Sequence, residues 1–165
     1  AESGMEIFVS SSFSKSFSLY GERVGALTLT TADNTLTAKV LSQVKTVIRT
    51  NYSNPPTHGA TVVATVLNSP ELYKLWEDEL GEMRVRIRNM REQLVEKIKE
   101  AGVEQDFSFV LEQNGMFSYS GLTEEQVERL REEFGIYAIS TGRICVAALN
   151  SSNIDYVAKA IAAVL

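Results

Sequence analysis

A single lysine stands among hydroxyl side chains near the start of the chain. Lys15 lies in the run SSSFSKSFSLYGERVG, residues 10–25, which also holds Arg23. A lysine amine becomes a nucleophile when burial or a nearby cation favours its neutral form. Serine hydroxyls and a forked guanidinium are groups that bind phosphate oxygens. A reactive amine beside such groups suits a phosphorylated aldehyde, namely pyridoxal phosphate held as a Schiff base.

Other interpretations of this run stay open at the level of the residues. A phosphate-binding loop without covalent chemistry would use the same hydroxyls, although the nucleotide pattern GxxxxGK[ST] is absent from the sequence. Lys15 could be a solvated surface charge. Arg23 could form an ordinary surface ion pair with Glu22.

Composition excludes several classes of partner. The formal net charge of −5 argues against nucleic acid or an anionic membrane. No apolar run approaches the roughly 18 residues of a spanning helix. The single histidine, His58, cannot form a multi-histidine metal site, and we expect it to be structural. The single cysteine, Cys145, indicates a reducing, cytoplasmic compartment and a core thiol.

The elements around the lysine run can be predicted from residue patterns. Asp33 is a suitable N-cap for the helix that follows it, and Pro55 cannot continue that helix. The predicted elements are a strand at 6–11, a strand at 24–31, a helix at 34–50 and a short buried helix at 60–67.

The longest predicted element begins at Ser69 and Pro70, which suit an N-cap and a first helical position. Apolar residues recur every three or four positions until Gly102, which suits a helix end. Such a helix is about 48 Å long. We expect it to connect two bodies, with a coiled coil as the alternative.

The second half alternates strand and helix patterns and predicts an α+β unit. Asn114 and Gly115 indicate a hairpin, while Thr123 and Gln126 form a capping box for a helix that ends at Gly135. The predicted strands are 107–113, 115–121, 136–140 and 143–149, and the last helix covers 151–165.

The segment SFSKSFSLYGERVG closely resembles the cofactor-lysine segment of the aspartate and aromatic amino acid aminotransferases, which are fold-type I pyridoxal-phosphate enzymes. The likeness continues through IRTNYSNPPTHGATVVATVL and FSFVLEQNGMFSYSGLTEEQVERLREEFGIYAISTGRICVA. It implies mixed α/β and α+β architecture. The implied parts are the end of the large cofactor-binding domain at 1–68, a long interdomain helix at 69–102 and the small C-terminal domain at 103–165.

The resemblance also implies the roles of individual residues. Lys15 would bind pyridoxal phosphate covalently and shuttle the proton at the substrate Cα. The other implied cofactor-binding residues are Ser12, Arg23 and Ser53, and the implied substrate-binding residues are Arg143, Arg49, Asn54 and Phe117. Arg143 would clamp the substrate α-carboxylate. Arg49 would meet a second substrate carboxylate in the neighbouring subunit's site.

Two of these arginines have simpler explanations from the residues alone. Arg143 could be a surface residue at a strand end. Arg49 could be a cation that stabilises a helix C-terminus.

The resemblance predicts transamination of aromatic amino acids with 2-oxoglutarate, in an enzyme that is a homodimer at full length. Aspartate is the alternative substrate. The family's glycine-rich loop and the carboxylate that pairs with the pyridine nitrogen have no counterpart in these residues. We therefore expect a C-terminal portion that is inactive alone. A non-catalytic remnant used for binding or dimerisation is the other alternative.

Overall fold

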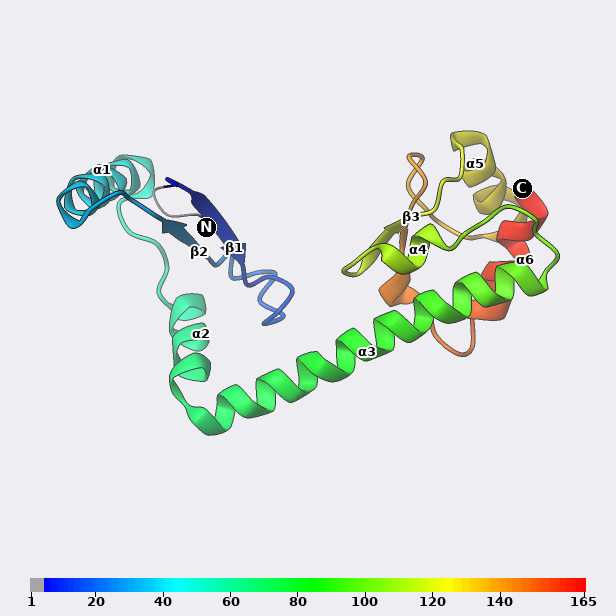
Figure 1. Ribbon diagram of the computed structural model, residues 1–165, viewed down its shortest axis with the longest axis horizontal. Coiled ribbons are helices and arrows are strands. Elements are labelled where there is room, and N and C mark those ends of the chain that lie inside the picture. Colours follow the sequence, from blue (N-terminus) through cyan, green and yellow to red (C-terminus); the bar gives the residue numbers. More distant parts are fainter. Residues whose placement is uncertain (1–4) are drawn as a thin grey trace. The chain divides into compact units, whose positions relative to one another are not determined.

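The computed structural model describes residues 5–165, and the chain divides into two compact units between Asp78 and Glu79. This division falls inside helix α3 (Pro70–Glu100), which is continuous in Figure 1. We describe the unit up to Asp78 as the first unit and the rest as the second unit. The finer domain boundaries expected from the sequence stay predictions.

The first unit begins with an antiparallel hairpin of β1 (Phe8–Ser12) and β2 (Gly25–Leu29), as the sequence predicts (Figure 1). The register pairs Phe8 with Leu29 and Ser12 with Gly25. A Cβ atom at Gly25 would lie 2.5 Å from the Ser11 carbonyl oxygen, so the two strands require glycine there. The hairpin holds the two ends of the lysine segment together.

Two helices follow the hairpin at the predicted places. Helix α1 (Asn34–Tyr52) begins at Asp33, whose Oδ1 accepts a hydrogen bond from the Leu36 N–H at 2.8 Å. Every residue of α1 is at least partly exposed. Helix α2 (His58–Asn68) buries Gly59 and Val63.

Helix α3 confirms the long predicted helix. The Ser69 hydroxyl accepts from the Leu72 N–H at 3.4 Å, and Gly102 adopts a left-handed φ of 87° just after the helix. Its C-terminal half buries Met90, Leu94 and Ile98 in the core of the second unit. This stripe therefore packs inside one unit, which argues against the coiled coil.

The second unit has one hydrophobic core, to which the C-terminal half of α3 and several later elements contribute. Its other elements are α4 (Phe109–Glu112), β3 (Phe117–Tyr119), α5 (Glu124–Phe134), β4 (Arg143–Cys145), a 3-10 turn η1 (Val146–Ala148) and α6 (Ile154–Val164). Strands β3 and β4 are antiparallel, with Phe117 opposite Cys145 and Tyr119 opposite Arg143. The predicted capping box of α5 and its glycine stop are confirmed.

Two predicted strands are wrong. Residues 107–113 contain the short helix α4, because Phe107 and Val110 both turn into the core while Asp106 accepts hydrogen bonds from the Ser108 N–H and hydroxyl. The partner of β3 is β4 rather than this segment. Residues 136–140 form no strand.

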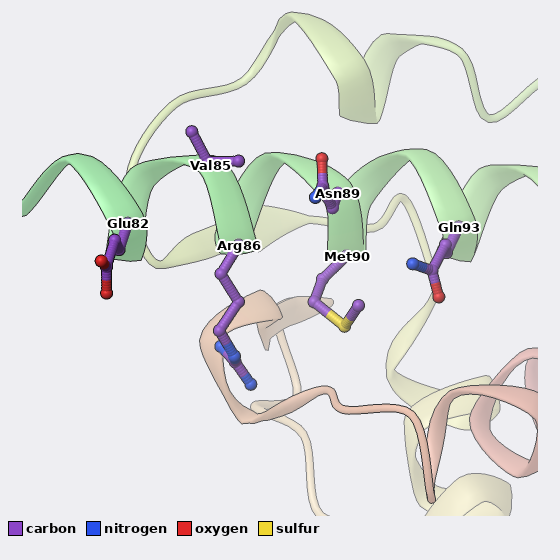
Figure 2. Close-up of a pocket in the computed structure, with 6 residues that line it drawn as sticks. All are labelled: Glu82, Val85, Arg86, Asn89, Met90 and Gln93. Carbon is purple, nitrogen blue, oxygen red and sulfur yellow. The ribbon is translucent and has the colours of Figure 1, made fainter.

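Helix α3 also holds the segment after β4 through Arg86. Its guanidinium donates to the carbonyl oxygens of Ala147 and Leu149 at 3.2 and 2.6 Å. Figure 2 shows Arg86 and Met90 extending from the same side of α3, in a shallow pocket. Along the described part of the chain, no helix is long and apolar enough to cross a membrane.

Candidate functional site

Lys15 lies in a tight turn between the two strands of the hairpin. The turn is closed by hydrogen bonds from the Phe17 N–H to the Phe13 carbonyl and from the Ser18 N–H to the Lys15 carbonyl, both 3.2 Å long. The Ser12 hydroxyl, at the end of β1, accepts from the Ser14 N–H at 3.3 Å. The structure therefore places Ser12 directly beside the lysine turn.

Arg23 lies at the other end of the same segment. Its Nη1 donates to the Tyr20 carbonyl oxygen at 2.9 Å, and a guanidinium has further N–H groups for an anion. Its φ is 53°, which is uncommon for a residue other than glycine. Such strained positions concentrate at binding sites because surrounding contacts must maintain them.

The Lys15 side chain is exposed rather than buried. Its Nζ lies 3.7 Å from the centre of the Tyr20 ring, in a cation–π contact. Apolar burial around the amine, the arrangement considered from the sequence, is not observed. The flanking Phe13 and Phe17 rings pack on each other instead, with centres 5.4 Å apart.

The side chain of Trp76 on α3 supports the lysine turn. Its ring stacks on Phe17 with centres 4.7 Å apart, and its Nε1 donates to the Ser16 carbonyl at 2.7 Å. No local pattern marks this contact, because the two partners are separated by 60 positions. The only sequence signal is that Trp76 is the single tryptophan of the chain.

Helix α2 packs against the second half of the lysine segment. A Cβ atom at Gly59 would lie 2.9 Å from the Glu22 Cβ and 3.1 Å from a Val24 methyl group. The His58 Nδ1 lies 3.0 Å from the Glu22 Oε2. Glu22 therefore pairs with His58, and the ion pair considered between Glu22 and Arg23 is not the observed arrangement.

The end of α1 gathers a second group of predicted residues. The Arg49 Nη1 donates to the Ser53 hydroxyl at 2.8 Å. Ser53 ends the helix with a φ of 66° and a ψ of −61°, and the Asn54 N–H donates to the Tyr52 carbonyl at 2.7 Å. Arg49, Ser53 and Asn54 are all exposed, so these groups can reach a ligand or a partner.

The second unit brings the remaining two predicted residues together. The Arg143 guanidinium carbon lies 5.0 Å from the centre of the Phe117 ring, across the β3–β4 pair. Both side chains are exposed. Gly142, next to Arg143, has a φ of 82°, and a Cβ there would lie 2.6 Å from the Leu122 carbonyl oxygen. Only glycine fits this approach.

A buried arginine fixes the strand that carries Phe117. The Arg91 guanidinium of α3 donates to the carbonyl oxygens of Val110, Gly115 and Phe117 at 3.2, 2.7 and 3.0 Å and to the Ser118 hydroxyl. Burial lowers the pKa of Arg91. The sequence analysis missed this residue, because nothing in the sequence distinguishes it from the other arginines of α3.

Comparison with known proteins decides the family. A model of the aminotransferase class I and II family matches residues 1–161. The chain belongs to this family. The predicted family is thereby confirmed, and transamination is the activity for which its relatives are named.

The relatives of this chain are named for both substrates, aspartate and aromatic amino acids. It is 70% identical over 165 residues to the aspartate aminotransferase of Pseudomonas aeruginosa, covering 100% of this chain and 42% of that protein. It is 52% identical to the aromatic-amino-acid aminotransferase of Escherichia coli, with the same two coverages. The chain therefore spans 42% of the length of these relatives. That this share is their C-terminal portion stays a prediction.

A solved structure of the aromatic-amino-acid aminotransferase from Burkholderia pseudomallei, covalently bound to pyridoxal phosphate, is also similar. The TM-score is 0.95 and the identity 70%, over 98% of this chain and 41% of that chain. Such neighbours confirm the expected mixed α/β fold at the level of the family.

The residues of this chain fit pyridoxal phosphate chemically. The lysine segment, which connects the two strands of the hairpin, offers an amine, serine hydroxyls and a guanidinium. These are the groups that a phosphorylated aldehyde needs, one for the aldehyde carbon and the others for the phosphate oxygens.

Proposed function

We propose that this chain contributes the lysine half of a pyridoxal-phosphate site that exchanges an amino group between an amino acid and a 2-oxo acid. The observation that carries the proposal is the grouping of Ser12, Lys15 and Arg23 by the β1–β2 hairpin. When bound, the cofactor would supply an aldehyde for the amine and a ring that withdraws electrons. Family membership supports the same activity.

The residues of the first unit bind and move protons in this proposal. The Lys15 Nζ leaves the Tyr20 ring, holds the cofactor, and then takes and returns the proton at the substrate Cα. Arg23 and the Ser12 hydroxyl bind the phosphate, to which a guanidinium can donate two parallel hydrogen bonds. Ser53, whose backbone also has a positive φ, is the further cofactor-binding residue.

Arg143 binds the substrate α-carboxylate in this proposal, because its exposed guanidinium can form a bidentate pair. Phe117 lies beside it and lines the pocket for the substrate side chain. Arg49 and Asn54 would bind a second substrate carboxylate across a homodimer interface. Their exposure at the end of α1 supports this role.

We propose aromatic amino acids and 2-oxoglutarate as the substrates. The 70% identity to a named aspartate aminotransferase favours aspartate as the second candidate. A chimera separates them: this chain replaces the matching residues of the Pseudomonas aeruginosa enzyme. We expect the ratio of kcat/KM for phenylalanine to kcat/KM for aspartate to be higher in the chimera than in the unaltered enzyme. An unchanged ratio would favour aspartate.

A visible absorbance band tests the cofactor role directly. Adding pyridoxal phosphate to the chain should produce a band that Lys15→Ala abolishes. Lys45→Ala, which removes an exposed lysine of α1 in the same unit, is the matched control and should keep the band. A band that both variants retain would reject the role of Lys15.

We further propose that these 165 residues do not catalyse turnover by themselves and act in a reducing, cytoplasmic compartment. The chain, incubated with cofactor, phenylalanine and 2-oxoglutarate, should form no glutamate beyond the cofactor alone. Sustained glutamate formation would contradict this proposal. A non-catalytic binding or dimerisation role is the alternative, and it predicts no Lys15-dependent band.

A further inference from the structure

The lysine turn has few contacts of its own that could fix its shape. It is closed by two hydrogen bonds of 3.2 Å, at the long limit for N–H···O bonds. Ser18, which ends the turn, has a φ of 55°, a conformation that is unfavourable for a residue other than glycine. An exposed turn of this kind needs contacts from another element to hold one conformation.

Trp76 supplies those contacts on the residues that follow Lys15. Its Nε1–H bond to the Ser16 carbonyl, 2.7 Å long, orients the second peptide group after the lysine. Its ring lies nearly parallel to Phe17, at 19° and 4.7 Å, while Phe17 meets Phe13 edge-on. Tyr73, one turn earlier on α3, packs against the same indole at 5.6 Å. Backbone and side chains of the turn are thus both attached to α3.

We propose that Trp76 is a positioning residue for Lys15, a role that rests on the proposed function of that lysine. The indole fixes the Ser16 peptide and the Phe17 ring, and these set the direction in which the Lys15 side chain leaves the backbone. Trp76 acts through the turn and needs no contact with the cofactor. Its loss leaves the Lys15 amine present but poorly directed toward the aldehyde.

Borohydride trapping measures this effect within one molecule. The Lys15 nitrogen bonds the aldehyde carbon and water leaves; borohydride then supplies hydride and makes the bond permanent. Mass spectrometry of peptides gives the labelling of Lys15 relative to Lys45, which lies on exposed α1 and serves as an internal standard. The ratio cancels differences in protein concentration and in reagent.

The variants separate the two contacts of the indole. Trp76→Phe keeps an aromatic ring but removes the N–H donor, and should lower the Lys15 to Lys45 ratio about fivefold, the value of one hydrogen bond. Trp76→Ala removes both contacts and should lower the ratio more than tenfold. Leu75→Ala, an exposed neighbour on α3, is the control and should leave the ratio unchanged. A labelling ratio that is higher in Trp76→Phe than in Trp76→Ala marks positioning by the aromatic ring. Circular dichroism of both variants checks that neither has lost its fold.

The outcomes distinguish this inference from the proposed function. If the unaltered chain labels Lys15 and Lys45 equally, the proposed function fails and the positioning role fails with it. If the unaltered chain prefers Lys15 and Trp76→Ala keeps that preference within twofold, only the positioning role is overturned. Trp76 fluorescence gives a second readout: cofactor loading should quench this single tryptophan, and Lys15→Ala should prevent the quenching.

Discussion

Replacing Arg91 by alanine should be among the most damaging single changes in the second unit. Its side chain is 3% exposed and donates to three carbonyl oxygens and the Ser118 hydroxyl. A hydrogen bond from a charged donor contributes about 1.5–3 kcal/mol, and each acceptor left buried without a partner adds a penalty. Because such terms are not additive, we expect a total loss of about 3–5 kcal/mol, as for other disrupted buried charge networks.

Hydrogen exchange of the buried α6 amides measures this loss of stability in the second unit itself. These amides exchange mainly when the unit opens, so 3–5 kcal/mol corresponds to about 10²- to 10⁴-fold faster exchange. Arg91→Lys should give an intermediate result, because one ammonium cannot satisfy acceptors spread over α4, β3 and the loop between them.

Arg88→Ala is the matched control on the same helix. Arg88 forms an exposed pair with Glu92 at 3.1 Å, and such pairs contribute about 1 kcal/mol or less. If Arg91→Ala accelerates exchange no more than Arg88→Ala, the reasoning about the buried guanidinium is refuted.

Three further changes have distinct expected outcomes. Gly142→Ala should destabilise the second unit by about 1–3 kcal/mol more than Gly102→Ala in urea unfolding, because both glycines have a positive φ but only a Cβ at Gly142 meets a carbonyl; equal losses would contradict this. The Lys97 Nζ lies 2.5 Å from the Asp155 Oδ1, and this hydrogen bond lowers the pKa of Asp155. The carboxylate therefore stabilises the fold above its pKa in the unfolded chain, and this stabilisation is lost as the pH falls through its pKa in the folded chain. Asp155→Asn should therefore lower the urea midpoint at pH 7, by an amount that shrinks as the pH falls below the ordinary carboxyl pKa of 3.8; a pH-independent difference would argue against the pair. Arg23→Ala should weaken pyridoxal phosphate binding at least tenfold by titration of the absorbance band while pyridoxal, which lacks the phosphate, binds equally to both proteins; an equal loss for both ligands would assign Arg23 a purely structural role.

Local chemistry was sufficient to predict most helices. Asp33, the Ser69–Pro70 pair and the Thr123–Gln126 box act within a few residues, and each lies where its helix begins. Residues 107–113 were mistaken for a strand because Phe and Val favour strands. Packing into the core determines the conformation of that segment, since Phe107 and Val110 are both buried.

The candidate site likewise combines residues that the local sequence predicts with contacts that it does not. Ser12, Lys15 and Arg23 lie on one short segment, so residue types and spacing were enough to associate them. The supports of this segment come from distant positions: Trp76 bonds Ser16, and His58 contacts Glu22. Such contacts depend on how α2 and α3 pack, which no local pattern encodes. The exposure of Lys15 was likewise not predictable from its apolar neighbours.

The most direct test of the account is a peptide map of the unaltered chain after incubation with limiting pyridoxal phosphate and reduction with borohydride. The account predicts that the cofactor label is concentrated on the peptide that contains Lys15, at least tenfold over any other lysine. Labelling spread evenly over the exposed lysines would contradict the assignment of Lys15 as the cofactor-binding residue.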